Sequence, residues 1–401
     1  MTRLRIGVVG ATGLVGRVLL DTLEERRFPV GELLPFGSGR SAAEGRFAGR
    51  RIPCRGASMA ALSSCDLVFL VSSDEVAKEY GLGLARSGVW VIDDSSAFRL
   101  DKRVPLVIPE VNSRDLSAKK RLIADPNCTM TGAALAGAVL LKSGRLRAVR
   151  IASYQAVSGA GKAALSEFFG QLRALVPGAG GETLIETPRL PKPAALPRAI
   201  AFNVFPQVGS FDAAGNTGEE WKVREELKKV WGLPRLAVSV TAVRVPVIRG
   251  HSLALWLEFE RRMSPARARS LLRHAPGVRL WKEGDYPTPA DAAGTWPAHV
   301  GRVRAGSSKK EIALWVVSDN LLKGAALNSV QIAETLLKKG WLKARYGCFG
   351  GASRVFTPPA IIRPRPTQES VKASRPGPMG FGLGSLSSPT LAARMIEMSG
   401  K

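Results

Sequence analysis

One cysteine, Cys128, stands where a polypeptide chain can turn a thiol into a nucleophile. Pro126 disfavours helix at Asp125, Asn127 is a good N-cap residue, and the small and apolar run 130–141 predicts a buried helix. Cys128 is therefore expected in the first helical turn, where unpaired backbone N–H groups and the helix dipole favour a thiolate. We expect its pKa to lie below that of a free thiol, which suits thioester chemistry. A buried structural cysteine is the alternative, and this stretch alone does not separate the two.

The composition predicts a soluble protein of two or three domains. The chain has 401 residues, 45% of them hydrophobic, and no apolar run long enough to span a bilayer. Its N-terminus leads straight into a strand pattern and does not resemble a signal peptide. The four cysteines lack the spacing of a disulfide framework or a zinc site: Cys54, Cys65, Cys128 and Cys348. We therefore expect a cytoplasmic protein without a metal centre and without a membrane partner.

The formal net charge of +25 is unusually high. Such a field attracts nucleic acid, but it equally attracts a dinucleotide phosphate or a phosphorylated substrate. The basic residues are dispersed along the chain and form no stripe interleaved with aromatic residues. A specific nucleic-acid surface is therefore the weaker interpretation.

The first forty residues carry the pattern of a dinucleotide fold. An apolar run from Leu4 to Val9 predicts a strand, the sequence GATGLVG follows at residues 10–16, and a helical pattern continues to Arg27. Glycines let the backbone turn tightly and approach a pyrophosphate at the helix N-terminus. The second predicted strand, 32–36, ends in Gly-Ser-Gly-Arg-Ser, where Arg40 replaces the acidic residue that binds a ribose hydroxyl. An arginine there favours NADP over NAD.

Further strands at 67–72 and 89–92 alternate with a helix at 77–86, which predicts a parallel, doubly wound α/β sheet. Arg99 follows the strand at 89–92, at the carboxyl edge where such sheets bind ligands, and could clamp a phosphate or a carboxylate. A strand at 147–155 begins a second domain and leads into a Ser-Gly-Ala-Gly-Lys turn at 158–162.

The second domain holds a further group of polar candidates. Glu219 and Lys222 are three residues apart at the start of a predicted helix and therefore share a face. Two alternating strands are predicted at 236–245 and 252–260, and the turn between them is expected to carry Arg244, Arg249 and His251. A histidine close to a substrate-binding cation suits a general acid or base. After Tyr346 the chain becomes rich in proline, glycine and serine, which predicts a disordered tail.

Taken together, these segments resemble bacterial aspartate-β-semialdehyde dehydrogenase over nearly all of residues 3 to 345. The order and spacing of its motifs carry the resemblance: GATGLVG, SGRSA, PEVN, PNCT, SYQAVSGAGK, EEWK, RVPVIRGHS and WVVSDNLLKGAALNSVQIAE. It implies an NADP-dependent homodimer in aspartate-family amino-acid biosynthesis, with a Rossmann-type sheet and a second α+β domain. The implied boundaries are 1–127 for the NADP-binding domain, completed by 320–345, then 128–319 for the catalytic and dimerisation domain, and 346–401 for the tail.

The resemblance also implies roles for individual residues. Cys128 would be the acyl-thioester nucleophile, His251 the acid/base, and Gln155 a residue that orients the substrate. Arg244 and Glu219 would hold the substrate's carboxylate and amino group. The phosphate would be bound by Arg99, Asn127 and Lys222. The expected NADP contacts are Gly10, Thr12, Gly13, Leu14, Val15, Arg40, Ser41, Ser158, Gly159 and Asn320.

Two alternatives stay open on the sequence. N-acetyl-γ-glutamyl-phosphate reductase shares the architecture and the thioester logic, although Glu219 suits a free α-amino group and PNCT with EEWK argues against this enzyme. A non-catalytic basic Rossmann scaffold that binds nucleic acid is the alternative from another class. The chain departs from the family pattern at Met130 beside the nucleophile, where a small hydroxyl residue is common, in its high charge and in its tail.

Overall fold

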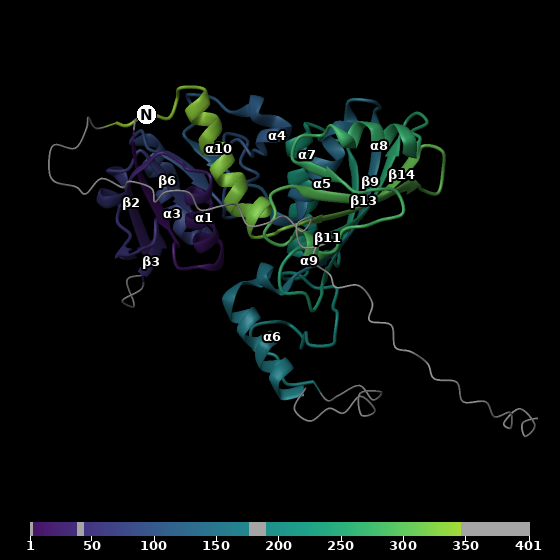
Figure 1. Ribbon diagram of the computed structural model, residues 1–401, viewed down its shortest axis with the longest axis horizontal. Helices are drawn as coiled ribbons and strands as arrows, with labels where there is room; N and C mark the ends of the chain where they lie inside the picture. Colours follow the sequence, from purple (N-terminus) through teal and green to yellow (C-terminus); the bar gives the residue numbers. More distant parts are fainter. Residues whose placement is uncertain (1–2, 38–43, 176–189, 346–401) are drawn as a thin grey trace, which may run out of the picture. The chain divides into compact units, whose positions relative to one another are not determined.

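The computed structural model describes residues 3–37, 44–175 and 190–345. Its first half is built on a parallel six-stranded sheet in the order β5-β2-β1-β6-β7-β8 (Figure 1). The strands are β1 (Leu4–Val9), β2 (Val30–Gly37), β5 (Arg55–Gly56), β6 (Leu67–Leu70), β7 (Trp90–Asp93) and β8 (Leu122–Ala124). β6, β7 and β8 are buried throughout, as expected for parallel strands covered on both faces. A small antiparallel pair, β3 (Glu44–Phe47) and β4 (Arg50–Pro53), is inserted after β2.

Helices α1 (Leu14–Glu25), α2 (Met59–Ser63), α3 (Asp74–Arg86) and α4 (Pro109–Asn112) connect these strands. The last helix, α10 (Leu327–Lys338), returns from the end of the described chain to this sheet. Its buried residues share one apolar cluster with β1 and α1, and Arg26 pairs with Glu334 at 2.7 Å. The C-terminal helix thus packs on the N-terminal strands, which is the contact that the predicted domain organisation requires.

The second sheet is mixed and has the order β10-β9-β11-β14-β13-β12. Its strands are β9 (Leu146–Gln155), β10 (Ala237–Arg244), β11 (His251–Phe259), β12 (Val278–Leu280), β13 (Ala298–Ala305) and β14 (Glu311–Ser318). Helices α5 (Cys128–Leu141), α7 (Gly218–Trp231) and α8 (Pro265–Arg273) lie along this sheet in Figure 1, and their apolar side chains join its strands in one buried cluster. The remaining helices of this half are α6 (Gly161–Leu175) and α9 (Pro289–Ala292).

The predicted fold class, a doubly wound parallel sheet joined to a second α+β part, is confirmed. One prediction of secondary structure is wrong: Arg244 and His251 do not lie in the turn between the two predicted strands. Arg244 is the last residue of β10 and His251 the first of β11, and β9 lies between these two strands. Strand order depends on contacts between distant segments, which a local pattern does not contain. The domain boundaries stay a prediction, and Arg40, Ser41 and the tail lie outside the described residues.

Candidate active site

The second sheet brings three predicted residues to one edge. β10 runs parallel to β9 with Arg244 opposite Gln155, so both strands end side by side. β11 runs antiparallel to β9 with Ser252 opposite Tyr154, so His251 begins β11 at the same edge. Arg244, Gln155 and His251 therefore form a row across three adjacent strands, although they are far apart in the sequence.

Helix α5 points its N-terminus at this row. Asn127 is the N-cap, and its side-chain oxygen accepts hydrogen bonds from the backbone N–H groups of Thr129 and Met130. The predicted placement of Cys128 in the first helical turn is confirmed. Its Sγ lies 3.4 Å from Nε2 of His251. A nucleophile and an imidazole are therefore in contact at a helix N-terminus, which is the arrangement of a cysteine enzyme.

The predicted low pKa of Cys128 is wrong. Burial and, after it, the nearby Glu219 carboxylate raise the pKa of the Cys128 thiol to about 12, against the lowering effect of Arg99. Burial and, after it, the positive charge of Arg244 lower the pKa of His251 to about 3. Loss of solvation thus outweighs the helix terminus here. The pair is a neutral thiol and a neutral imidazole.

The tautomer of His251 follows from its second nitrogen. The backbone N–H of Ala156 donates to Nδ1 at 3.0 Å, so Nδ1 carries a lone pair. In a neutral imidazole the proton is then on Nε2, the nitrogen that faces the sulfur. His251 is therefore placed to donate a hydrogen bond toward Cys128. An imidazolium would bring a second N–H against that of Ala156, and the low pKa agrees with its exclusion.

Glu219 links the elements around the sulfur. Its carboxylate accepts hydrogen bonds from Asn127 Nδ2 at 3.0 Å, Thr129 Oγ1 at 3.2 Å and Gln155 Nε2 at 3.2 Å. Helix α7, which carries Glu219, begins with a capping box formed by Thr217 and Glu220 that fixes its first turn. The structure therefore brings Glu219, Asn127 and Gln155 together, as the sequence interpretation requires.

The two predicted arginines are both buried near the sulfur. Arg244 Nη1 donates to the carbonyl of Ala156 at 2.7 Å, so Ala156 joins Arg244 to His251 through its two backbone groups. Arg99 Nη1 contacts Glu226 at 3.2 Å and its Nη2 donates to the carbonyl of Asp94 at 2.8 Å. The Nε of Arg99 is buried without a hydrogen-bond partner among the described residues. An unpaired buried donor of this kind fits an anionic ligand.

Lys222 is the last of the predicted phosphate-binding residues. It is half-buried, one turn after Glu219 on α7. Burial acts to raise the pKa of Asp74, but hydrogen bonds from Ser96 and the charge of Lys222 lower it overall. Ser96 lies in the segment between β7 and Arg99, so Lys222 is close to the loop that carries Arg99.

One functional candidate, Glu226, has no signal among the sequence motifs. It is fully buried, its pKa is raised by that burial, and its second oxygen accepts the backbone N–H of Asn127 at 2.7 Å. Its spacing of seven residues from Glu219 places it on the same face of α7. Outside the motifs, this spacing was the one hint in the sequence that Glu226 faces the site. It was not sufficient, because a glutamate on a helix is ordinarily solvent-exposed.

The loop between β1 and α1 fits a dinucleotide. Gly10 has a φ of +90°, and a side chain there would collide with the carbonyl of Val71. Gly13 is the N-cap of α1 without a side-chain cap bond, and no acidic residue lies in the first turn. The predicted contacts Thr12, Leu14 and Val15 lie in the same loop and the first helical turn. Backbone N–H groups at such a helix start bind a pyrophosphate.

Three further predicted cofactor residues lie beside His251: Ser158, Gly159 and Asn320. Asn320 Nδ2 donates to Ser158 Oγ at 3.0 Å, and Asn320 Oδ1 accepts the backbone N–H of Gly250 at 2.8 Å. A Cβ at Gly159 would come within 3.1 Å of both His251 and Arg244. The absence of a side chain at Gly159 thus leaves room against the imidazole.

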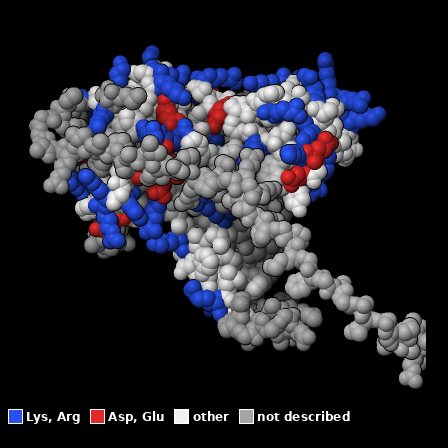
Figure 2. Space-filling model, in the orientation of Figure 1, with Lys and Arg blue, Asp and Glu red and all other residues white. Residues whose placement is uncertain are grey.

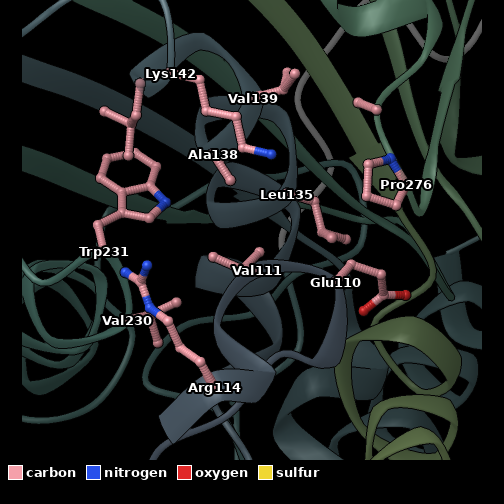
Figure 3. Close-up of a pocket in the computed structure, with 12 residues that line it drawn as sticks. Glu110, Val111, Arg114, Leu135, Ala138, Val139, Lys142, Val230, Trp231 and Pro276 are labelled. Carbon is pink, nitrogen blue, oxygen red and sulfur yellow. The ribbon is translucent and has the colours of Figure 1, made fainter.

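A cavity of about 240 Å³ lies elsewhere, between α4, α5, the end of α7 and the loop after α8 (Figure 3). Leu135 and Val139 of α5 and Trp231 of α7 contribute to its wall, and none of the candidate site residues lines it. No cluster of metal-ligating side chains was found among residues 3–37, 44–175 and 190–345, and no helix within those ranges is long and apolar enough to cross a membrane. On the face in Figure 2, Lys and Arg are spread over both halves without forming a single stripe.

Two family models match the chain. Residues 5–119 match the semialdehyde dehydrogenase NAD binding domain, and residues 138–323 match the semialdehyde dehydrogenase dimerisation domain. Aspartate-semialdehyde dehydrogenase of Shewanella violacea is 40% identical over 337 residues, which cover 82% of this chain and 97% of the relative. The enzyme of Bacillus subtilis is 40% identical over 342 residues, 84% of this chain and 98% of the relative. The crystal structure of aspartate semialdehyde dehydrogenase II from Vibrio cholerae has a TM-score of 0.79 at 35% identity and covers 84% and 99% of the two chains.

A dinucleotide-type sheet joined to a Cys–His pair at the edge of a second sheet defines a dehydrogenase of the semialdehyde class. Within that class, the chain belongs to the aspartate-semialdehyde dehydrogenase family. Membership confirms the predicted oxidoreductase class and NADP as the cofactor. The matches favour this family over the N-acetyl-γ-glutamyl-phosphate reductase and the nucleic-acid-binding scaffold that the sequence left open.

Proposed function

We propose that the protein reduces L-4-aspartyl phosphate to L-aspartate 4-semialdehyde with NADPH, through a thioester on Cys128, in aspartate-family amino-acid biosynthesis. The observation that carries the proposal is the 3.4 Å contact between Cys128 Sγ and His251 Nε2 at the N-terminus of α5. The names of the matched relatives support the choice of substrate, and the polar groups around this contact suit each part of it.

Cys128 is the nucleophile. Its thiolate attacks the acyl carbon, the bond from that carbon to the phosphate oxygen breaks, and the acyl group stays on Sγ as a thioester. NADPH supplies a hydride to the thioester carbon when it is bound. The oxyanion that results re-forms its carbonyl and expels the Cys128 thiolate, which releases the aldehyde. Because the resting thiol is neutral, it must lose its proton as it attacks, and the departing phosphate oxygen accepts that proton and leaves as hydrogen phosphate.

His251 acts in this scheme as a neutral hydrogen-bond donor. We restrict the predicted acid/base role to hydrogen-bond donation, because Nδ1 accepts the backbone N–H of Ala156 and the ring proton is on Nε2. A neutral imidazole N–H stabilises a thiolate and an oxyanion without giving up its proton, as neutral imidazoles do in other enzymes. Gln155 donates to Glu219 at 3.2 Å, so its amide is held in place to orient the substrate beside the sulfur.

Substrate recognition divides between two groups of charges. Arg244 binds the α-carboxylate and Glu219 the α-amino group, which an N-acetylated substrate cannot offer as a cation. Arg99, Asn127 and Lys222 bind the phosphate. Of these, Arg99 has the clearest support because its buried Nε has no hydrogen-bond partner in the described part of the chain.

The cofactor is held by both halves of the chain in this proposal. The pyrophosphate lies on the loop and helix start formed by Gly10, Thr12, Gly13, Leu14 and Val15. Arg40 and Ser41 bind the 2′-phosphate and select NADP over NAD. Ser158, Gly159 and Asn320 contact the nicotinamide half. The match to a dimerisation domain supports a homodimer, and the family membership supports a cytoplasmic enzyme.

The test is phosphate-dependent reduction of NADP⁺ with L-aspartate 4-semialdehyde, followed by absorbance. We expect turnover that requires phosphate and far slower turnover with N-acetyl-L-glutamate 5-semialdehyde. Faster turnover of the N-acetylated aldehyde would assign the protein to the other reductase. Salt-dependent retention on DNA without dehydrogenase activity would favour a nucleic-acid-binding scaffold.

A further inference from the structure

We propose that Glu226 is a positioning residue that sets the phosphate-binding arginine and the nucleophile's helix in one geometry. The inference rests on the proposed role of Arg99 in phosphate binding. Glu226 lies on α7 seven residues after Glu219 and is completely buried. A buried carboxylate is costly unless its charge and its hydrogen bonds are matched, so its partners reveal what it holds.

Glu226 uses its two oxygens on two different elements. One oxygen contacts Arg99 Nη1 at 3.2 Å, and the other accepts the backbone N–H of Asn127 at 2.7 Å. Asn127 is the N-cap residue immediately before Cys128. A single carboxylate thus fixes the distance between the proposed phosphate site and the start of the helix that carries the sulfur.

The same contact orients the guanidinium of Arg99. Arginine has five N–H donors in a rigid plane, and two contacts, to Glu226 and to the carbonyl of Asp94, fix that plane. Its Nε stays buried and unpaired among the described residues. We assign that unpaired N–H to the ligand, and a phosphate oxygen is the acceptor that suits it.

Lys229 anchors the loop that carries Arg99 to the same helix. Its ammonium donates to three backbone carbonyls, those of Arg99, Asp101 and Val104, at 2.7 to 2.8 Å. All three N–H donors of the ammonium are used, so Lys229 ties the Arg99 loop to α7. Glu226 holds the side chain of Arg99, and Lys229, one turn later on α7, holds its backbone.

The decisive variant is Glu226→Gln. An amide can accept from only one of the two donors, and its NH₂ group then faces the other donor. Either Arg99 or the start of α5 must move. Because hydrogen bonds to charged groups contribute about 1.5–3 kcal/mol, we expect the KM for phosphate to rise about tenfold to a hundredfold in aldehyde oxidation. The KM for NADP⁺ should stay unchanged.

Two further variants separate positioning from general destabilisation. Glu225→Gln is the matched control, because within the described part of the chain Glu225 pairs only with Arg224 and Lys228, on the half-buried side of α7. Its phosphate KM should not change. Lys229→Met keeps the Glu226–Arg99 contact but frees the loop, and we expect a phosphate KM increase of about threefold or more. If Glu226→Gln does not fold, Glu226→Asp, which keeps the charge but is too short to reach both Arg99 and Asn127, takes its place, and an unchanged phosphate KM in that variant overturns the proposal.

Phosphate binding without turnover gives a readout that is independent of the reaction. Unfolding midpoints are measured against inorganic phosphate, without aldehyde or cofactor, in the unmodified dimer and in each variant. We expect half-saturation to shift to at least tenfold higher phosphate in Glu226→Gln. Tighter phosphate binding in this variant would mean that Glu226 acts only by repelling the anion. Unchanged phosphate binding would mean that Glu226 acts only in folding. Either result overturns the proposal. Phosphate stabilisation in a protein without dehydrogenase activity would reject the proposed function alone.

Discussion

The π-helix Leu322–Ala326 packs against the nucleophile, and Gly324 is the point of contact. A Cβ built on Gly324 would lie 2.8 Å from Cys128 Cβ and 3.1 Å from its Cα, whereas ordinary contacts begin at 3.4 Å. Gly324→Ala must therefore displace one of the two segments by roughly 0.6 Å on that spacing. Such overpacking costs about 1–3 kcal/mol of stability. A displacement of this size at a reacting atom lowers kcat by about tenfold to a hundredfold.

The assay is kcat for aldehyde oxidation together with the unfolding midpoint and the dissociation constant for NADPH. The π-helix also packs on α1 and begins two residues after Asn320, so the NADPH dissociation constant shows whether the displacement reaches the cofactor site. Gly170→Ala is the control: Gly170 is in α6, and a Cβ added there would have no atom within 4 Å, so alanine at this position should stabilise by about 0.5–1 kcal/mol through helix propensity. An unchanged kcat in a folded Gly324→Ala protein would refute the claim that this contact positions the sulfur.

Four more predictions concern the imidazole, the cofactor and the tail. His251→Gln should lower kcat about a hundredfold to a thousandfold, as expected for the loss of an oxyanion donor, while acylation of the protein by acyl phosphate persists. The folded-state pKa of His251 is lowered to about 3 from 6.5, so the unfolded chain binds the extra proton and stability falls as pH drops below 6.5. Between pH 7 and pH 5 the loss is about 2 kcal/mol, and urea unfolding should find it absent in His251→Gln. Arg40→Asp should erode the preference for NADP in kcat/KM, and equal efficiency of the unmodified protein with NAD would contradict the role of Arg40. Truncation after Arg345 should leave activity and dimer mass intact, and a collapse of solubility would show that the tail packs on the body.

Local patterns predicted the elements that depend on neighbouring residues. The strand Leu4–Val9, the glycine loop and the start of α5 at Cys128 follow from periodicity, backbone freedom and capping, and all three are confirmed. The residues that the motifs singled out around Cys128, Gln155 and His251 also come together in space. These residues are far apart in the sequence and meet only because the second sheet pairs their strands. The family resemblance, not the local pattern, predicted that they would meet.

Features that depend on tertiary burial were not available from the sequence. The helix terminus argued for a thiolate at Cys128, but loss of solvation and the nearby Glu219 raise its pKa to about 12. Glu226 looks like a surface residue until α7 is placed against Arg99 and Asn127. The separation of β10 from β11 by β9 likewise follows from long-range pairing. In each of these cases the outcome depends on a contact between segments that are distant in the sequence.

The most direct test of the central claim is peptide mass spectrometry after incubation with L-4-aspartyl phosphate in the absence of NADPH. We expect one acyl adduct, on the peptide that contains Cys128, and none in Cys128→Ser, which should still bind NADPH. Serine fails because its hydroxyl has too high a pKa to act as the nucleophile in this site. An adduct on Cys54, Cys65 or Cys348 instead, or full turnover by Cys128→Ser, would contradict the assignment of Cys128 as the residue that carries the thioester.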